Sequence, residues 1–515
     1  MVIIMTRFTR EQVKRLLPSD VIVYIKKALF IIRKQILFYQ QISDRLKKKV
    51  YAAILSAFPK THWAYERILA LVCRHRHEHP SDASRQFLNY FQSYLKVRPD
   101  AIFKWRLEAY NSYLLLHDHV GLHNTMQYFI DSQKAFIKSH QLDVLNFRIA
   151  NNIFYANYNT HAYLDTHIKA MLLGWQLEHK ILVFLREEGT ICNPEMLKYW
   201  EKYVEVITDP YAIKTLSLFS DYFLDDLTCT AYLNGRAIYI EHAKCVVQKE
   251  WERQNRQPLF QLNSEHREFG REQLAKAGIP KDSWFVSLHV RDPGYKKGSY
   301  LAKEEYDSYR NADIESYKLA IQEVVQRGGY VIRVGDPKMK PFIAVEGFFD
   351  YALSDIRSNR MDIFLFSQCR CFVGVSSGPV LTPVLFGVPV VMTNFVPMSG
   401  RPHAGNCIFI PKLLWLRDER RYATFHEVLS SDLGRMFTSH GYEEKRIDII
   451  DNSPEEIRDV VVEMLDRLDG NAVYSEEDEK RQRSITELYQ KYSGYGDMGR
   501  MGKAFIQNYA NQGLL

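Results

Sequence analysis

Positively charged and hydroxyl-bearing side chains follow several short apolar runs in the second half of the chain. At the carboxyl end of a parallel strand, such side chains point into a ligand crevice. The planar fork of an arginine can grip a diphosphate there, and the start of the next helix favours an anion. These patterns predict a nucleotide cleft whose binding residues are Arg291, Asp292, Arg310, Asn311, Arg333, Gly335, Ser376, Ser377, Gly378 and Asn394.

The stretch from Cys371 to Asn394, CFVGVSSGPVLTPVLFGVPVVMTN, predicts a strand, a tight turn, a helix and a second strand. Gly374 and Gly378 leave room for a ligand to approach the backbone. The two serines between them can cap the helix or donate hydroxyl groups. A purely structural turn in a parallel sheet is the alternative interpretation of this G-x-S-S-G segment.

Several of these candidates also have a structural explanation, whereas Arg310 and Asn311 have none as simple. Arg291 and Asp292 could form a surface ion pair, and Asp313 fits a helix N-cap. Arg333, which lies between two apolar neighbours on an inner strand, requires an anion or a carboxylate partner. His289 fits a satisfied core histidine as well as a catalytic one.

The chain lacks the usual motifs that hold a nucleotide through a metal ion or a glycine-rich loop. It contains no D-x-D, no Walker loop and no G-x-G-x-x-G fingerprint. We therefore expect no metal site. Positive side chains and a helix dipole would instead stabilise a leaving diphosphate.

Composition describes a folded globular protein. The chain has 515 residues, enough for about three domains, with 46% hydrophobic and 25% charged residues. A net charge of +7 fits a phosphate-bearing substrate or an anionic membrane surface better than a nucleic-acid partner. The seven cysteines form no C-x-x-C pair, which indicates neither a disulfide framework nor a zinc site and favours a cytoplasmic location. No apolar run approaches the ~20 residues of a membrane span.

The first part of the chain has a helical pattern. Residues 1–50 are basic and amphipathic, and they fit a helix that lies on an anionic bilayer or one that covers a domain with a solvated basic face. Residues 51–145 predict helical hairpins of the tetratricopeptide kind, with an ordinary helical bundle as the alternative.

From residue 146 onward, short apolar runs alternate with helical segments. This rhythm predicts an α/β fold with two Rossmann-like lobes, residues 146–278 and 279–470, and a cleft between them. Residues 453–470 have the signals of a capped helix, because Ser453 and Pro454 open the segment and Gly470 stops it. A polar tail, residues 471–515, is expected to be helical and to return over the lobes.

A set of motifs in fixed order resembles glycosyltransferases of bacterial surface-polysaccharide gene clusters. The resemblance covers mainly residues 280–470 and implies a GT-B fold whose carboxyl-terminal lobe holds the donor. His289 and Arg291 also resemble the His-x-Arg segment of GDP-fucose-using transferases, although the second arginine and the later acid of that pattern are absent. The motifs are HVRDPGY (289–295), YRNADIESY (309–317), GGYVIRVGD (328–336), FVGVSSGP (372–379), LFGVPVVMTN (385–394) and IPKLLW (410–415).

The GT-B resemblance implies that the catalytic base comes from the amino-terminal lobe. His161 and Asp165 in NTHAYLDTH are the best-placed candidates, with His167 behind them, and His289 is a further catalytic candidate. An imidazole near neutral pKa suits deprotonation of a hydroxyl. Alternatively, His161 occupies a loop or caps the helix.

The resemblance implies a metal-independent hexosyl- or deoxyhexosyltransferase that uses a GDP- or UDP-linked sugar and no further cofactor. Its acceptor would be a surface-polysaccharide or lipid-linked glycan at the cytoplasmic face of the inner membrane. Two alternatives remain open: a nucleotide-sugar epimerase of the same fold, and a non-catalytic scaffold whose helical repeats bind a partner.

Overall fold

The computed structural model describes residues 51–514 with short gaps. The gaps are 53, 56–59, 61, 75–79, 117, 143–145, 151–157, 186–190, 218–223, 226–229, 293–307, 343–344, 401 and 493–497. The predicted basic segment 1–50 therefore lies outside the described residues. The chain forms two compact units that meet after Leu122, within helix α8 (His119–Ser139), whereas the sequence pattern changes near residue 145.

The first unit is helical. Helices α5 (His62–Arg74), α6 (Pro80–Val97) and α7 (Ala101–Leu115) pack against their neighbours in sequence. Their contacts are aromatic: the rings of Tyr65 and Tyr94 stack at 5.1 Å, and those of Phe87 and Trp105 lie 6.1 Å apart. This packing is that of a small helical bundle, and the structure does not establish a tetratricopeptide repeat.

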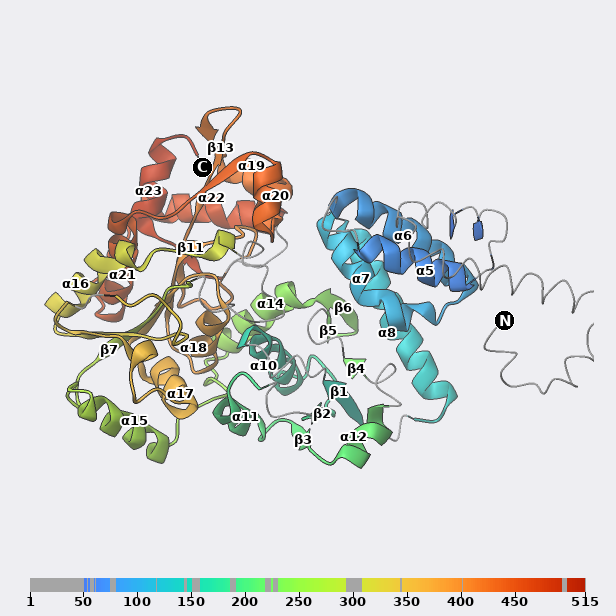
Figure 1. The fold of residues 1–515 in the computed structure, drawn as a ribbon, viewed down its shortest axis with the longest axis horizontal. Coiled ribbons are helices and arrows are strands. Elements are labelled where there is room, and N and C mark those ends of the chain that lie inside the picture. The colour runs from blue at the N-terminus through green and yellow to red at the C-terminus, as the bar shows by residue number, and fades with distance from the viewer. Residues whose placement is uncertain are drawn as a thin grey trace, which may run out of the picture. The chain divides into compact units, whose positions relative to one another are not determined.

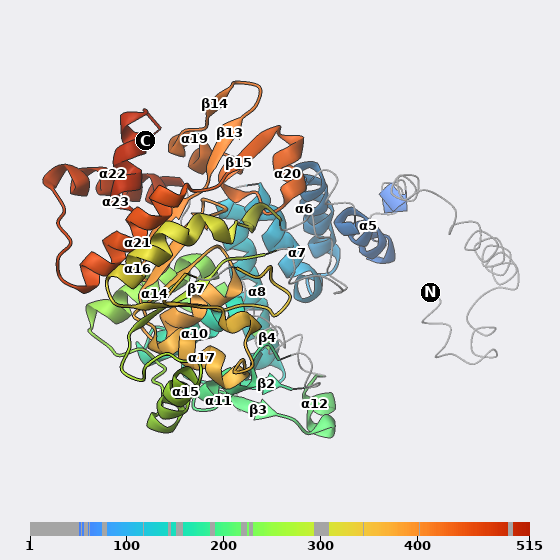
Figure 2. The same ribbon diagram turned by 60° about the vertical axis from the view of Figure 1, so that its left-hand side comes forward.

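A seven-stranded parallel sheet forms the centre of the second unit (Figures 1 and 2). Each strand predicted between residues 284 and 410 is present, and the tail adds a seventh strand that the sequence pattern did not predict. In spatial order the strands are β16 (Arg500–Met501), β12 (Ile408–Pro411), β11 (Val390–Phe395), β10 (Cys371–Gly374), β7 (Phe285–His289), β8 (Tyr330–Arg333) and β9 (Phe348–Phe349).

Helices cover both faces of this sheet, which explains why its strands are continuously apolar. Val286 and Leu288 of β7 face α16 (Lys318–Gln326) and α21 (Pro454–Leu468). On the opposite face, Ser287 donates a hydrogen bond of 2.8 Å to the Leu365 carbonyl in α17 (Asn359–Gln368). The predicted capped helix is confirmed as α21, where Ser453 and Glu456 form a capping box.

The strand order reverses between β7 and β10. The chain passes from β7 to β8 and β9 on one side, then returns to place β10 on the other side of β7. His289 and Gly374, the last residues of these two strands, are register partners. In open α/β sheets a ligand binds at such a topological switch point, beyond the carboxyl ends of the strands.

A second, four-stranded parallel sheet precedes the large one. Its order is β3 (Glu205–Ile207), β2 (Lys180–Phe184), β1 (Phe147–Ala150) and β4 (Leu224–Asp225). The predicted run 153–155 lies outside the described residues. Between and after these strands come α10 (Tyr158–Leu172), α11 (Pro194–Trp200), α12 (Pro210–Leu216), the β5–β6 hairpin (Thr230–Leu233 and Arg236–Tyr239) and α14 (Ile240–Arg253).

One hydrophobic core joins the two sheets. Helix α10 packs on the 3-10 helix η7 (Gly378–Leu381) and on α18 (Thr382–Leu385), which follow β10. The ring of Tyr199 in α11 also lies 5.5 Å from the ring of Phe386, the residue after α18. Leu164 and Ile168 of α10 belong to the same core cluster as the residues of the large sheet. The inner side of α10 is therefore packed core.

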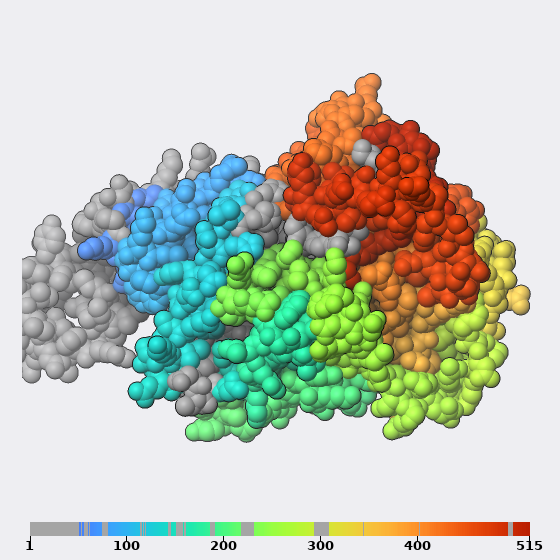
Figure 3. Space-filling view, turned by 180° about the vertical axis from the view of Figure 1, so that it is seen from behind, coloured from blue at the N-terminus to red at the C-terminus, as the bar shows by residue number. Residues whose placement is uncertain are grey.

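The remaining elements complete the larger lobe. A three-stranded antiparallel sheet, in the order β14, β13 and β15, follows β12, and the tail helices form one continuous surface with it in the space-filling view (Figure 3). None of the helices in the described ranges has the length and apolarity needed to cross a membrane. The elements are β13 (Leu413–Leu416), β14 (Arg421–Tyr422), β15 (Ile447–Ile450), α15 (Ser264–Lys276), α19 (Phe425–Ser430), α20 (Ser439–Glu444), α22 (Glu476–Tyr492) and α23 (Lys503–Asn511).

A buried asparagine pair ties the end of β11 to the end of β12. The Asn394 backbone N–H donates to Asn452 Oδ1 at 2.5 Å, and the Asn452 backbone N–H donates to Asn394 Oδ1 at 2.8 Å. Asn452 Nδ2 also donates to the Pro411 carbonyl at 2.8 Å. Asn394 has a φ of +49°, a conformation that asparagine tolerates better than most residues. The pair fixes the direction in which the chain leaves β12.

We expect Asn452→Ala to destabilise the protein by about 3–5 kcal/mol. The substitution removes the two hydrogen bonds made by the Asn452 side chain and leaves the buried Asn394 N–H and Pro411 carbonyl unpaired. Urea denaturation followed by tryptophan fluorescence measures the change. The control Asn508→Ala, at an exposed position, should change stability by less than about 0.5 kcal/mol. Equal losses in the two variants would contradict the proposed importance of the pair.

Candidate functional site

The carboxyl ends of the parallel strands bring several candidates to one edge of the large sheet. Arg291 follows β7, Gly335 follows β8, Ser376 follows β10 and Lys412 follows β12. A loop that contains the 3-10 helix η4 (Ser308–Arg310) and Asn311 contacts the residues that follow β7 and β12. The arrangement is the one in which α/β proteins hold their ligands.

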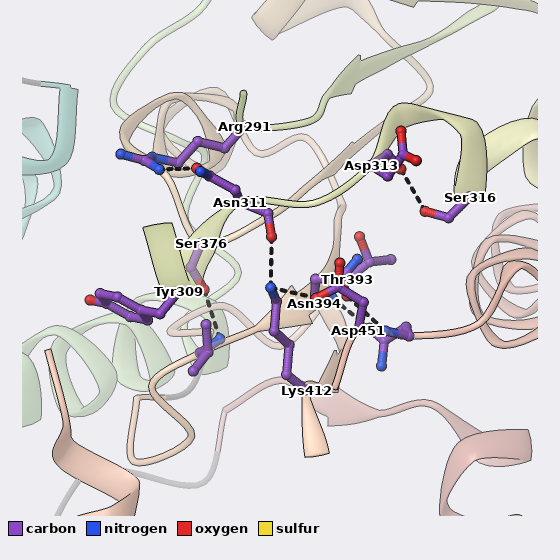
Figure 4. Close-up of polar contacts among 12 residues, drawn as sticks. Arg291, Tyr309, Asn311, Asp313, Ser316, Ser376, Thr393, Asn394, Lys412 and Asp451 are labelled. Atoms are coloured by element: carbon purple, nitrogen blue, oxygen red, sulfur yellow. Dashed lines mark hydrogen bonds and ion pairs between the residues drawn. The ribbon is translucent and has the colours of Figure 1, made fainter. Parts of the chain in front are cut away.

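Two cationic side chains donate hydrogen bonds to one asparagine at this edge (Figure 4). Arg291 Nη1 donates to the side-chain oxygen Oδ1 of Asn311. Lys412 Nζ donates to the backbone oxygen of Asn311 at 2.7 Å and pairs with Asp451 Oδ1 at 2.7 Å. Because Asn311 accepts from both, it joins the loop after β7 to the end of β12.

Lys412 is an unusual lysine because its side chain is only 3% exposed. Burial lowers the pKa of its ammonium group, the nearby Arg291 lowers it further, and Asp451 acts in the opposite direction. Asp451 itself is 45% exposed, so water screens its charge. The buried ammonium group of Lys412 would therefore be stabilised by a further anion nearby.

The switch point between β7 and β10 carries a neutral histidine. His289 Nδ1 and Ser377 Oγ lie 3.0 Å apart, and Ser377 Oγ also lies 3.2 Å from the Val375 carbonyl. Burial lowers the pKa of His289 to about 4, and Arg333 and Arg291 contribute to the shift. The imidazole is thus uncharged near neutral pH, and it orients the turn that leads into η7.

The turn after β10 is held by hydrogen bonds of its serine side chains to neighbouring segments. Ser376 Oγ accepts a hydrogen bond of 3.0 Å from the Val396 backbone N–H. Ser377 is the N-cap of η7, yet its side chain makes no capping bond, and Gly378 is the first residue of that helix. A Cβ on Gly374 would lie 2.9 Å from the Phe372 ring, so close packing explains this glycine.

Arg333 and Asn394 are placed in the interior. Arg333 is 1% exposed, and its Nη1 donates to Asp350 Oδ2 at 3.0 Å and to the Lys340 carbonyl at 2.8 Å. The requirement for a carboxylate partner is thus confirmed. Asn394 is fully buried in the asparagine pair, and neither residue has a surface that a substrate could reach.

The other predicted residues surround the cluster. Asp292 is half-buried and accepts from the Lys340 backbone N–H at 3.5 Å, while the guanidinium of Arg310 lies 5.7 Å from the Tyr309 ring. A Cβ on Gly335 would lie 2.3 Å from the Met339 sulfur. Asp313 caps η5 (Ile314–Tyr317) through a bond of 3.2 Å from the Glu315 N–H, which confirms its structural interpretation. Residues 293–295 of the HVRDPGY motif lie outside the described residues.

The candidates for the base lie on α10, inside the core shared by the two sheets. His161 is 2% exposed; its Nδ1 accepts from Trp200 Nε1 at 2.8 Å, and its Nε2 lies 3.6 Å from Cys192 Sγ. Burial lowers the pKa of His161 to about 4. These are the contacts of a satisfied core histidine, and a substrate hydroxyl has no access to the ring.

Asp165 and His167 share this burial. Asp165 Oδ2 pairs with Lys169 Nζ at 2.7 Å, and Lys169 also donates to Gln248 Oε1 at 2.8 Å. Burial raises the pKa of Asp165, and Lys169 lowers it. His167 Nδ1 lies 3.3 Å from Gln176 Oε1. The predicted cleft between the lobes would expose these three side chains, but α10 packs against η7 and α18 and all three are buried.

Lys412 was missed by the sequence interpretation, although the chain carries a signal for it. It follows the apolar run 407–411 in the same way that Arg291 follows 285–290. Among the described residues, no group of three or more His, Cys, Asp or Glu side chains is arranged to hold a metal ion.

Comparisons with known proteins are sparse. No family model and no curated protein matches the chain. Among solved structures it is similar to a glycosyl transferase of family 9 from Veillonella parvula DSM 2008, with 10% identity over 52% of this chain and 85% of that chain, at a TM-score of 0.31. It is also similar to the E. coli ADP-heptose LPS heptosyltransferase II, with 11% identity over 52% and 90% and a TM-score of 0.30. Because these TM-scores are low, we base no functional argument on them.

We expect the protein to lose stability as the pH falls from about 6.5 to about 4. His161 and His289 have folded-state pKa values lowered from 6.5 to about 4, so within this window the unfolded chain binds more protons than the folded one. His161→Gln should reduce the acid-induced loss in melting temperature. His440→Gln, at an exposed histidine, is the control and should keep the parent profile. Identical profiles for both variants would contradict the effect of burial at His161.

Proposed function

We propose that this protein is a glycosyltransferase that moves a sugar from a nucleoside diphosphate donor to a hydroxyl group of a glycan acceptor. The observation that carries the proposal is the convergence of Arg291 and Lys412 on Asn311, at the carboxyl edge of a parallel sheet. Two cations at this edge suit a ligand that carries two adjacent phosphates.

The chemistry of transfer explains why such a pair is useful. The acceptor oxygen forms a bond to the anomeric carbon, the bond from that carbon to the diphosphate oxygen breaks, and the acceptor hydroxyl loses its proton. Negative charge develops on the departing diphosphate. Arg291 can bind it through two parallel N–H groups, and Lys412 adds a point charge in a site of low dielectric. The proposal needs no metal ion for this step.

Three features support a donor at the switch point. The neutral His289 holds Ser377, so the turn after β10 is oriented before a ligand arrives. Asn394 and Asn452 fix the exit of β12 and hence the direction of Lys412. Asn311 links the two cations without neutralising them. Preorganised charges of this kind act without a reorganisation cost during the reaction.

The finer assignments extend the proposal. The donor would be a GDP- or UDP-linked hexose or deoxyhexose, and the acceptor a surface-polysaccharide or lipid-linked glycan. The net charge of +7 favours binding of the protein to an anionic membrane surface, on the cytoplasmic side of that membrane. The buried positions of His161 and Asp165 leave the base unassigned.

We expect Arg291→Ala and Lys412→Met each to lower kcat/KM for the donor about 100-fold, because each removes one positive charge that stabilises the leaving group. A thermal-shift panel of UDP-, GDP-, CMP- and dTDP-sugars first identifies the donor, and transfer is then assayed with it. Arg458→Ala, at a half-exposed arginine of the same lobe, is the matched control and should retain parent activity. The proposal fails if no nucleotide sugar stabilises the protein or if the two cation variants remain fully active.

His161→Gln distinguishes a core histidine from a catalytic base. We expect a lower melting temperature with kcat within a few-fold of the parent, because the ring contacts Trp200 and not the substrate. Loss of a general base would instead reduce kcat by about 100- to 10,000-fold. Donor turnover without any acceptor, with interconversion of the sugar, would favour the epimerase alternative.

A further inference from the structure

A groove that neither Arg291 nor Lys412 lines opens where the small antiparallel sheet meets residues 512–514. Its cavity has a volume of about 440 Å³, within the range of roughly 300–1,000 Å³ that small-molecule sites occupy. Figure 2 shows the β13–β14 hairpin projecting at the top of the lobe. The residues that line the groove include Trp415, Arg420, Tyr422, Thr424, Gln512 and Leu514.

One wall of the groove is aromatic. Trp415 and Tyr422 are register partners on β13 and β14, and their rings meet edge to face at 5.0 Å. Both are half-exposed, and within the described residues the Trp415 indole N–H has no hydrogen-bond partner. An amphipathic ring of this kind offers an apolar face together with a polar handle. Sugar rings have the complementary surface, with apolar C–H faces and polar hydroxyl edges.

The lip of the groove carries an uncompensated positive charge. Arg420 is exposed and forms no ion pair with any described residue, whereas neighbouring acids already have partners. Arg421 pairs with Glu419 and Glu427 at 2.6 Å each, and Arg446 pairs with Asp418 at 2.6 Å. An anionic ligand would therefore meet Arg420 without competing with a carboxylate of the hairpin.

Arg420 is also held in an unfavourable backbone conformation. Its φ is +53°, which is uncommon for any residue except glycine, asparagine and aspartate. The Arg420 N–H donates to the Leu416 carbonyl at 2.8 Å, and the ion pairs of Arg421 brace the same turn. This hydrogen bond fixes the backbone of the hairpin loop, and asparagine would suit the same conformation at position 420.

We propose that this groove binds an anionic oligosaccharide, with Trp415 and Tyr422 packing on a sugar ring and Arg420 binding its acidic group. The groove lies outside the Arg291–Lys412 cluster and does not depend on the function proposed for that cluster. Its ligand is recognised as a glycan surface, not as a nucleotide.

Isothermal titration calorimetry of the full chain tests the proposal. The probe is a tetrasaccharide of alternating glucuronate and N-acetylglucosamine, and the neutral comparison is a tetramer of N-acetylglucosamine. We expect the acidic probe to bind and the neutral one to bind at least about tenfold more weakly, because a charge-assisted hydrogen bond is lost. Arg420→Asn should weaken acidic-probe binding about tenfold. This variant suits the positive φ and so should fold normally.

Matched variants make the result decisive. Arg483→Ala, at an exposed arginine of α22 outside the groove, should bind the acidic probe as the parent does, and Trp415→Ala should abolish binding. Arg291→Ala should also bind normally, because the nucleotide cluster is separate. The proposal is overturned if the parent does not bind the acidic probe, if the neutral tetramer binds equally well, or if Arg420→Asn matches Arg483→Ala. Loss of binding in Arg291→Ala would overturn the independence of the groove.

Discussion

Two like charges, Arg291 and Lys412, are held near each other by the oxygens of one asparagine. Asn311 accepts from the guanidinium through its side chain and from the ammonium through its backbone. Like charges repel, and burial disfavours a charged ammonium, so the pair depends on rigid support. That support comes from Asn394 of β11, from Asn452 after β15, which bonds to the end of β12, and from Asp451. The arrangement keeps two positively charged side chains close together at the carboxyl edge of the sheet.

The interface between the two sheets imposes a second constraint. Helix α10 lies against η7 and α18, which begin immediately after the turn of β10. Its polar residues, including His161 and Asp165, are satisfied by Trp200 and Lys169 in a nearly water-free interior. The same packing fixes the position of η7, and hence of Ser377. The helix therefore contributes to the candidate site by positioning it rather than by exposing a reactive group.

Much of the fold was predictable from local pattern. The strands of the large sheet are continuous apolar runs because both of their faces are covered, and α21 carries a complete set of helix-start signals. Strand β16 was not predictable in this way. It is two residues long, lies in a polar tail, and pairs with β12 only because the tail folds back over the lobe.

The sequence predicted which types of residue form the candidate site, but not which individual residues do so. Sequence by itself determined that arginines and serines would follow buried strands, because strand residues must be apolar and polar residues cluster where strands end. Arg291 and Arg333 satisfy that pattern equally well. Only the tertiary structure decided that Arg333 forms an ion pair with Asp350 in the interior. At the edge of the sheet, Arg291 and Lys412 both donate hydrogen bonds to Asn311. The reason is that a charged side chain pairs with whichever partner the packing of the chain brings near it. Asp350 and Lys412 do not neighbour Arg333 and Arg291 in the sequence, so local pattern does not reveal these contacts.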